Sequence, residues 1–110
     1  MRVGAHVSAA GGLDKAIDRA VEIGAETLQF FCSPPQGWAF KPVAPEMAQA
    51  FREKAAANDI DRVFLHGVYL VNLGTENPVN LKRGIESLTN HMNTASAIGA
   101  VGVIFHPGSH

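Results

Sequence analysis

Short apolar runs alternate with longer amphipathic segments along this chain. The runs are four to six residues long and rich in β-branched or aromatic side chains, which is typical of buried strands and too short for helices. They cover residues 3–7, 27–32, 63–66 and 101–106. The pattern therefore predicts four strands that follow one another in the sequence.

The segments between these runs carry apolar residues at intervals of three and four, which is the spacing of an amphipathic helix. Pro45 suits a helix start, Asn77-Pro78 or Asn80 suits another, and Gly24 and Gly99 suit helix ends. Three helices are therefore predicted. Their expected buried faces are Leu13, Ala16, Ile17, Ala20 and Val21; then Met47, Phe51 and Ala55; then Leu81, Ile85, Leu88, Met92 and Ala95.

The resulting order, β-α-β-α-β-α-β, implies parallel strands joined by right-handed crossovers. Doubly wound sheets and (β/α)8 barrels both begin this way. A complete barrel needs about 250 residues, and a chain of 110 residues offers three βα units and a fourth strand. We expect an α/β fold, a partial TIM (β/α)8 barrel, with residues 1–110 forming the N-terminal fragment of a single domain.

The composition, 46% hydrophobic and 17% charged, is that of a globular protein, and no apolar run approaches the length of a membrane span. The start of the sequence lacks the apolar core of a secretory signal, and the single cysteine, Cys32, fits a reducing compartment. A cytoplasmic location is expected. The net charge of -1 excludes a strongly basic field, so binding to DNA would need local geometry or a metal ion.

Three histidines fall at or near the carboxyl ends of predicted strands: His6, His66 and His106. In parallel α/β proteins this edge carries the functional site, and imidazoles from separate strands can converge on one metal ion. Hydrogen-bonded histidines at the rim of the fold are an equally open interpretation. His91 is expected on the surface of the third helix, and His110 is too near the terminus to interpret.

Other segments carry weaker signals. The small-residue loop 8–12 precedes a helix and could hold an anion, although a plain tight turn is the favoured interpretation. Phe40 is expected to cover the edge of the barrel, whereas Trp38 could cover it or stack on nucleotides. Tyr69 could belong to the core or to the site. Cys32 is expected to be a buried, unreactive thiol.

Three stretches together resemble known motifs: GAHVSAAGGL from Gly4, LHGVYLVNLG from Leu65 and FHPGSH from Phe105. They are similar to motifs of the endonuclease IV family, the zinc-dependent apurinic/apyrimidinic endonucleases of DNA repair, and the similarity runs in register along the chain. The resemblance implies a TIM barrel with three zinc ions at its C-terminal face. It also implies double-stranded DNA with abasic sites as substrate, nucleotide flipping and hydrolysis of the phosphodiester 5' to the lesion.

Carried over residue by residue, the resemblance implies that His66 and His106 are ligands of one zinc ion. Tyr69 matches a tyrosine that contacts DNA, and His6 belongs to a family motif in which it would contact the substrate or orient groups in the pocket. The loop containing Gln36 and Trp38 matches the segment that enters the DNA stack, but Gln36 stands where an arginine is usual.

The family's remaining zinc ligands come from later strands, so no catalytic residue is assigned in this chain. At most one partial zinc site is expected, and the 110-residue chain is expected to be inactive alone. Open sheet edges favour a homo-oligomer. Two alternatives remain: a sugar isomerase or epimerase on a similar barrel, and an inactive self-assembling fragment.

Overall fold

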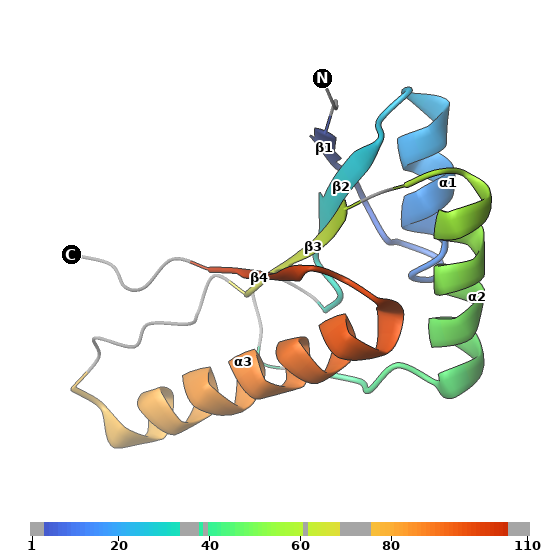
Figure 1. Ribbon diagram of the computed structural model, residues 1–110. Helices are drawn as coiled ribbons and strands as arrows, with labels where there is room; N and C mark the ends of the chain where they lie inside the picture. The colour runs from blue at the N-terminus through green and yellow to red at the C-terminus, as the bar shows by residue number, and fades with distance from the viewer. Residues whose placement is uncertain (1–3, 34–37, 39, 61, 69–75, 106–110) are drawn as a thin grey trace.

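The computed structural model describes residues 4–33, 38, 40–60, 62–68 and 76–105. Strands and helices alternate as the sequence predicts (Figure 1). Some described residues of the apolar runs lie outside the strands, namely Val7, Phe31, Cys32, Val101 and Phe105, and β3 begins one residue before its run. The elements are β1 (Gly4–His6), α1 (Lys15–Glu22), β2 (Thr27–Phe30), α2 (Pro45–Ala57), β3 (Arg62–His66), α3 (Pro78–Ile98) and β4 (Gly102–Ile104).

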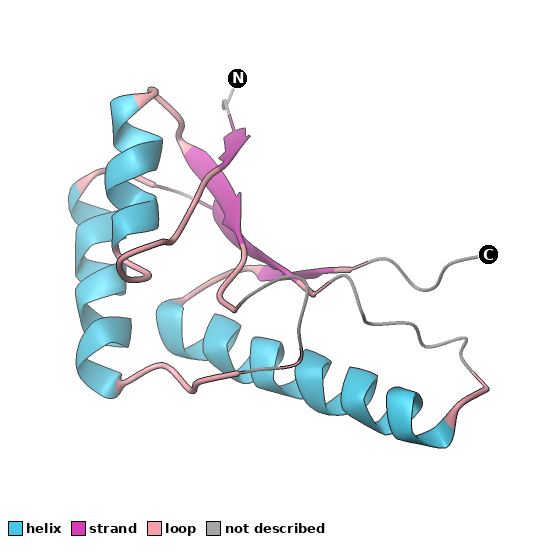
Figure 2. Ribbon diagram, turned by 180° about the vertical axis from the view of Figure 1, so that it is seen from behind, coloured by secondary structure: helices cyan, strands magenta, loops and turns pink. Residues whose placement is uncertain are grey.

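The four described strands form one parallel sheet in the order β1-β2-β3-β4. All three described helices lie on the same face of this sheet, as opposite views agree (Figures 1 and 2). A doubly wound sheet would carry helices on both faces, whereas a (β/α)8 barrel places them all outside. The architecture is therefore α/β and corresponds to an arc of a TIM barrel.

The core lies between the sheet and its helices. Alternate strand residues, including Leu28, Phe30 and Leu65, point to the helices and are at most 2% exposed. Phe30 meets Phe51 of α2 with ring centroids 5.7 Å apart. Ile17 of α1 is also fully buried. This alternation is expected for strands that have one face covered, because successive side chains point to opposite faces.

Helix α1 buries Ala16, Ile17 and Ala20, as predicted. The prediction was wrong for Val21, which is 44% exposed, because a short helix with small core residues presents only a narrow stripe to the sheet. Leu13 precedes the helix and is half-buried.

Helix α3 begins at Asn77-Pro78, the first of its two predicted starts, and ends at Gly99 as predicted. The side chain of Asn77 accepts hydrogen bonds from the backbone N–H of Val79 at 2.9 Å and of Asn80 at 3.3 Å. Gly99 ends the helix in the left-handed region, at φ 75°, where a residue without a Cβ avoids strain. Among the described helices, none has the length and apolar character needed to cross a membrane.

The predicted buried face of α3 was wrong for two of its five residues, and Leu81 and Leu88 are half-buried. Ile85 and Met92 are 53% and 57% exposed, and only Ala95 of the predicted stripe is fully buried. The helix instead approaches its neighbours through a face rich in small or polar residues, because small side chains allow closer packing. The buried residues are Gly84, Ser87, His91, Thr94, Ala95 and Ile98.

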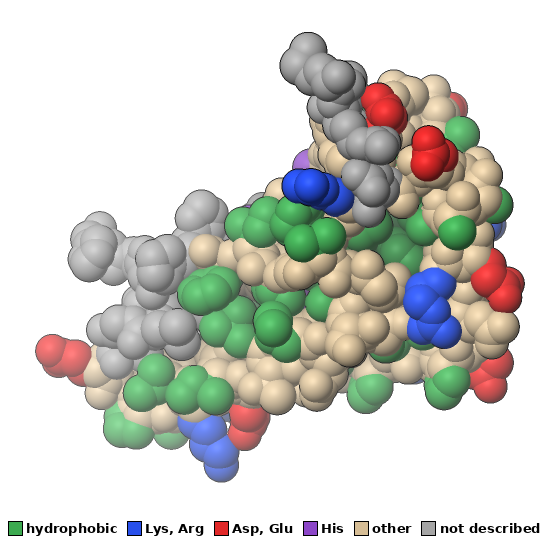
Figure 3. Space-filling view, viewed as in Figure 1, with side chains coloured by type: hydrophobic (Ala, Val, Ile, Leu, Met, Phe, Trp, Pro, Cys, Tyr) green, Lys and Arg blue, Asp and Glu red, His purple; other side chains and the backbone are tan. Residues whose placement is uncertain are grey.

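Exposed apolar side chains gather over the sheet and along α3 (Figure 3). Val79, Ile85 and Met92 belong to α3, and Ile104 lies on the edge strand β4, where it is 40% exposed. Apolar surface of this kind, next to an open strand edge, is typical of a surface that binds another protein element.

Candidate functional site at the carboxyl edge of the sheet

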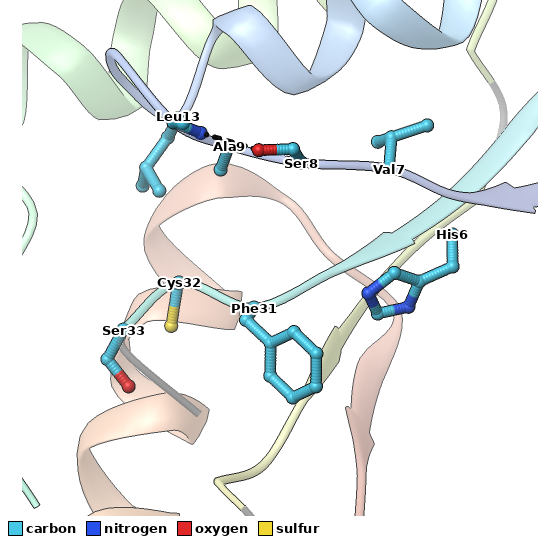
Figure 4. A pocket seen from close by; sticks show the side chains of 9 residues that line it. His6, Val7, Ser8, Ala9, Leu13, Phe31, Cys32 and Ser33 are labelled. Carbon is cyan, nitrogen blue, oxygen red and sulfur yellow. Dashed lines mark hydrogen bonds between the residues drawn. The ribbon is translucent and has the colours of Figure 1, made fainter. Parts of the chain in front are cut away.

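A pocket of about 610 Å³ lies where β1 and β2 end (Figure 4). Its walls come from the segments that leave these two strands. Its lining includes His6, Ser8, Ala10, Phe31, Cys32 and Ser33. Because the carboxyl ends of parallel strands carry the functional groups of TIM barrels, this pocket is the candidate site.

Three rings from three different strand ends meet at this edge. Phe31 lies 5.0 Å from His6 and 4.8 Å from His66, measured between ring centroids, and the two imidazoles are 6.4 Å apart. His6 is exposed and His66 is half-buried. The sequence prediction that these two histidines share one edge is therefore confirmed by the geometry.

The imidazole of His66 is oriented by the backbone beside it. Its Nδ1 lies 2.6 Å from the carbonyl oxygen of Gly67, which can only accept, so Nδ1 carries the proton. Nε2 is then the ring atom with the lone pair. Metal-binding histidines in proteins are commonly held in this way, with one ring nitrogen donating and the other coordinating.

The segment after His66 lies close to the end of β4. The Gly67 N–H donates to the carbonyl of Ile104 at 2.7 Å, and His66 is the register partner of Ile104. A Cβ at Gly67 would lie 3.2 Å from the Cβ of Phe105, so glycine permits this approach. His106 follows Phe105 directly but lies outside the described residues.

The described residues contain part of the predicted zinc site. Within residues 4–33, 38, 40–60, 62–68 and 76–105, no group of three or more His, Cys, Asp or Glu side chains is arranged to hold a metal ion. His66 by itself suits a metal, because its tautomer leaves Nε2 as the donor atom. The described part of the chain thus supplies one imidazole of the predicted pair.

Two other predicted DNA-contact residues, Gln36 and Tyr69, also lie outside the described residues. Trp38 is described and half-buried. Phe40 packs against His91 of α3, with centroids 5.5 Å apart, so it covers part of a helix. The structure thus brings His6 and His66 together and leaves the grouping of the remaining predicted residues a prediction.

The loop between β1 and α1 is held by an arginine that the sequence analysis did not single out. Arg19 donates to the carbonyl oxygens of Ser8 at 2.7 Å and of Ala10 at 2.8 Å. The Ser8 hydroxyl accepts from the Ala10 N–H at 3.1 Å. Only the position of Arg19, one turn into the helix after a small-residue loop, could have suggested this contact.

Cys32 follows β2 and is half-buried. Burial raises the pKa of its thiol to about 11, and a backbone hydrogen bond opposes that rise in part. The thiolate is the reactive form of cysteine, so this environment supports the predicted unreactive thiol.

The surface position predicted for His91 was wrong, since the side chain is completely buried in α3. Its Nδ1 lies 2.7 Å from the carbonyl of Ser87, and its Nε2 meets no hydrogen-bond partner among the described atoms. Burial is the main cause of its lowered pKa; the hydrogen bond to Ser87 opposes that shift, and an electrostatic interaction with His66 adds to it. The sequence pattern did not indicate this burial, because a histidine near Thr89, Asn90 and Asn93 is typical of a solvated helix face.

Comparison with known proteins connects this geometry to a family. Residues 17–110 match the family model described as Xylose isomerase-like TIM barrel. A protein of Streptomyces coelicolor named "Probable endonuclease 4" is 40% identical over 97% of this chain, and one of a Geobacter species with the same name is 37% identical over 98%. The chain spans 36% and 38% of the lengths of these two relatives.

This chain is also similar to a solved structure of an endonuclease IV. The crystal structure of endonuclease IV from Thermus thermophilus superimposes on 99% of this chain with a TM-score of 0.93 and 32% sequence identity. The matched part is 41% of that chain.

Proposed function

Because this chain belongs to the Xylose isomerase-like TIM barrel family, and is related over nearly its whole length to endonuclease IV proteins, we propose that it is part of a DNA-repair endonuclease. The proposed reaction is hydrolysis of the phosphodiester 5' to an abasic site. The observation that carries the proposal is the superposition on 99% of the chain at a TM-score of 0.93. That match, at 32% identity, favours the nuclease over a sugar isomerase.

His66 and His106 are proposed to hold one zinc ion. His66 has the required tautomer, and its strand neighbour is Ile104, two residues before His106. When bound, zinc acts as a Lewis acid that polarises a phosphoryl oxygen and lowers the pKa of water. Two imidazoles leave half of a tetrahedral coordination sphere to other donors, so we expect weak binding by this chain.

The DNA-binding residues are proposed to be His6, Gln36, Trp38 and Tyr69. His6 lies at the pocket mouth, where it could contact a flipped sugar-phosphate group. Moving a nucleotide out of the stack costs least where its base is missing. Because the net charge of the chain is only -1, selectivity for the lesion must come from such local contacts.

The 110 residues by themselves are proposed to be inactive. The chain spans 36% to 41% of the lengths of the relatives it matches, and we assign it no catalytic group beyond the partial metal site. The hydrolysis reaction, its DNA substrate and the zinc content are proposed for a whole protein of this kind.

Self-association is proposed for the isolated chain. Among the described strands, β1 and β4 each pair on one side only, and Ile104 of β4 is 40% exposed. Pairing of such edges removes apolar surface and satisfies backbone groups. Sedimentation at micromolar concentration should give a dimer or larger species, and a uniform monomer would contradict this part of the proposal.

A chimera gives the sharpest test of the nuclease function. Residues 1–110 would replace the matched segment of Thermus thermophilus endonuclease IV, and the purified chimera would be incubated with an abasic-site duplex and an intact duplex. We expect zinc-dependent cleavage of the abasic duplex only, and loss of at least about tenfold in kcat with His66→Ala. A folded chimera that leaves the abasic duplex intact would overturn the function, whereas cleavage by the 110-residue chain alone would overturn its proposed inactivity.

Zinc binding can be measured on the chain itself by calorimetry. His66→Ala and His106→Ala should each abolish the weak binding of one equivalent. His91→Leu is the matched control because it removes a histidine that is buried in α3 and is not assigned as a ligand, and one equivalent should still bind. Equal binding by all three variants would contradict the assigned ligands.

A further inference from the structure

Arg19 joins two backbone carbonyl groups of the loop that forms one wall of the pocket. It extends from α1 and donates to the carbonyl oxygens of Ser8 and Ala10 at 2.7 and 2.8 Å. Both acceptor residues line the 610 Å³ pocket. We propose that Arg19 is a positioning residue, which fixes this loop in the conformation that receives the substrate, and this inference rests on the proposed function.

Apart from those to Arg19, the described hydrogen bonds of residues 8–12 stay within the loop or join it to Lys15, and Ala9 packs against the core. Gly11 and Gly12 adopt φ angles of 93° and 139°, which glycine reaches at low cost, so their backbone has many alternative conformations in the absence of outside contacts. Within the loop, the Gly12 N–H donates to the carbonyl oxygen of Ala9 at 3.1 Å, and the Ala10 N–H donates to the Ser8 hydroxyl. A guanidinium that joins two carbonyls two residues apart selects one of these conformations.

An arginine suits this task better than a lysine. Its planar guanidinium donates from two separate nitrogens in a fixed fork, here Nη1 to Ser8 and Nη2 to Ala10, whereas an ammonium is a single point. The contact also has an electrostatic consequence. Two carbonyl oxygens are paired with a cation beside the pocket, which reduces the repulsion that an anionic phosphate would meet there.

The chain supplies a matched control in Arg52. Its guanidinium also donates to a backbone carbonyl, that of Ala97, and it joins α2 to the last turn of α3. Ala97 lies at the C-terminal end of α3, which precedes β4, so this contact belongs to the opposite edge of the sheet from the pocket. Arg52→Met should therefore cost stability without changing the loop, and Arg19→Met should change the loop.

Amide hydrogen exchange tests the positioning without any ligand. In Arg19→Met the exchange of Ala10 and Gly12 should accelerate at least about tenfold, with Arg19→Lys intermediate. In Arg52→Met these two amides should keep their protection relative to the core amides of β2. Unchanged exchange of Ala10 and Gly12 in Arg19→Met would overturn the inference, whatever the chain does with DNA.

Binding to DNA then tests the consequence for the site. Fluorescence anisotropy would compare a duplex containing a tetrahydrofuran abasic analogue with an intact duplex. We expect Arg19→Met to weaken binding of the abasic duplex by roughly five- to tenfold, Arg19→Lys to restore part of it, and Arg52→Met to match the parent chain. Faster exchange with unchanged affinity for the abasic duplex would overturn a role in substrate positioning.

The two proposals fail in different ways. If the parent chain does not prefer the abasic duplex, the proposed DNA function fails for this chain, and the exchange of Ala10 and Gly12 still decides whether Arg19 fixes the loop. If the parent chain prefers the abasic duplex and Arg19→Met retains that preference in full, the function stands and the inference about Arg19 fails.

Discussion

The two faces of the sheet are built from the same four strands, yet they differ sharply. The face toward the helices carries Leu28, Phe30, Val63 and Leu65, none more than 5% exposed. The neighbouring residues on the opposite face, among them Gln29, Phe64 and His66, are half-buried, and Arg62 is exposed.

Within a single strand, the residues that stabilise the fold and the residues near the candidate site therefore alternate. Alternate positions of β2 and β3 supply either the apolar core or the polar and aromatic groups near the pocket. Within the described part of the chain, the covered face is complete, whereas the open face has no layer packed on it. Stability should therefore depend on the first face and recognition on the second.

The largest effect is expected from Phe51, which is fully buried against Phe30 on the covered face. Phe51→Ala should lower the free energy of unfolding by about 3–5 kcal/mol, because it removes apolar contacts and leaves a cavity. Urea unfolding followed by circular dichroism measures this loss.

Phe64→Ala is the matched control on the open face. The side chain of Phe64 is half-buried and none of the described helices packs on it, so its loss should cost about 1 kcal/mol or less. Phe64→Ala should weaken self-association more than it lowers the free energy of unfolding, which is measured at low protein concentration. Equal losses from the two variants would show that the open face is packed as tightly as the covered one, and the comparison would fail.

A smaller effect is expected from His91, which lies on the covered side. Its pKa is lowered from the ordinary value of 6.5, chiefly by burial, so the unfolded chain binds a proton more readily than the folded chain. The stability that neutral His91 contributes is fully present above pH 6.5. The free energy of unfolding should fall as the pH drops from about 6.5 to the lower pKa of the folded state. Urea unfolding at about pH 7.5 and about pH 5.5, on either side of this value, measures the difference.

His91→Leu removes this titration and a buried nitrogen that has no partner among the described atoms. Replacing such a group by an apolar side chain is often neutral or stabilising. The variant should therefore match or exceed the parent chain at about pH 5.5 and show a flatter pH dependence. The same pH dependence in both proteins would mean that other groups cause it.

The sequence pattern predicted the elements of the fold better than their orientation. The alternation of apolar runs and amphipathic segments predicted all seven described elements, because strand and helix periods differ and Asn77 and Gly99 mark their helix clearly. The pattern failed for the rotation of α3, since it counts apolar residues such as Ile85 and Met92 and cannot tell which side finds a partner. His91 was misplaced for the same reason.

The site was predicted unevenly. His6 and His66 were expected at one edge because carboxyl ends of parallel strands coincide, and their rings lie 6.4 Å apart. Arg19 was missed because its two bonds go to backbone carbonyls, and the folded path of a loop cannot be inferred from side-chain type. His106 was named from its position after a strand, and its pairing with His66 stays a prediction.

The smallest effect concerns Cys32, which is partly buried against the core and lines the pocket. With a thiol pKa of about 11, the thiolate at about pH 8 is about one part in a thousand, so reaction with a disulfide reagent such as DTNB should be on the order of a hundredfold slower in the folded chain than in urea. The rate should rise about tenfold per pH unit up to about pH 10. Cys32→Ser serves as the blank and should bind the abasic duplex like the parent chain. Rapid labelling of the folded chain at about pH 8 would mean that water reaches this thiol as freely as it reaches the open face, and Cys32 would then not belong with the covered core.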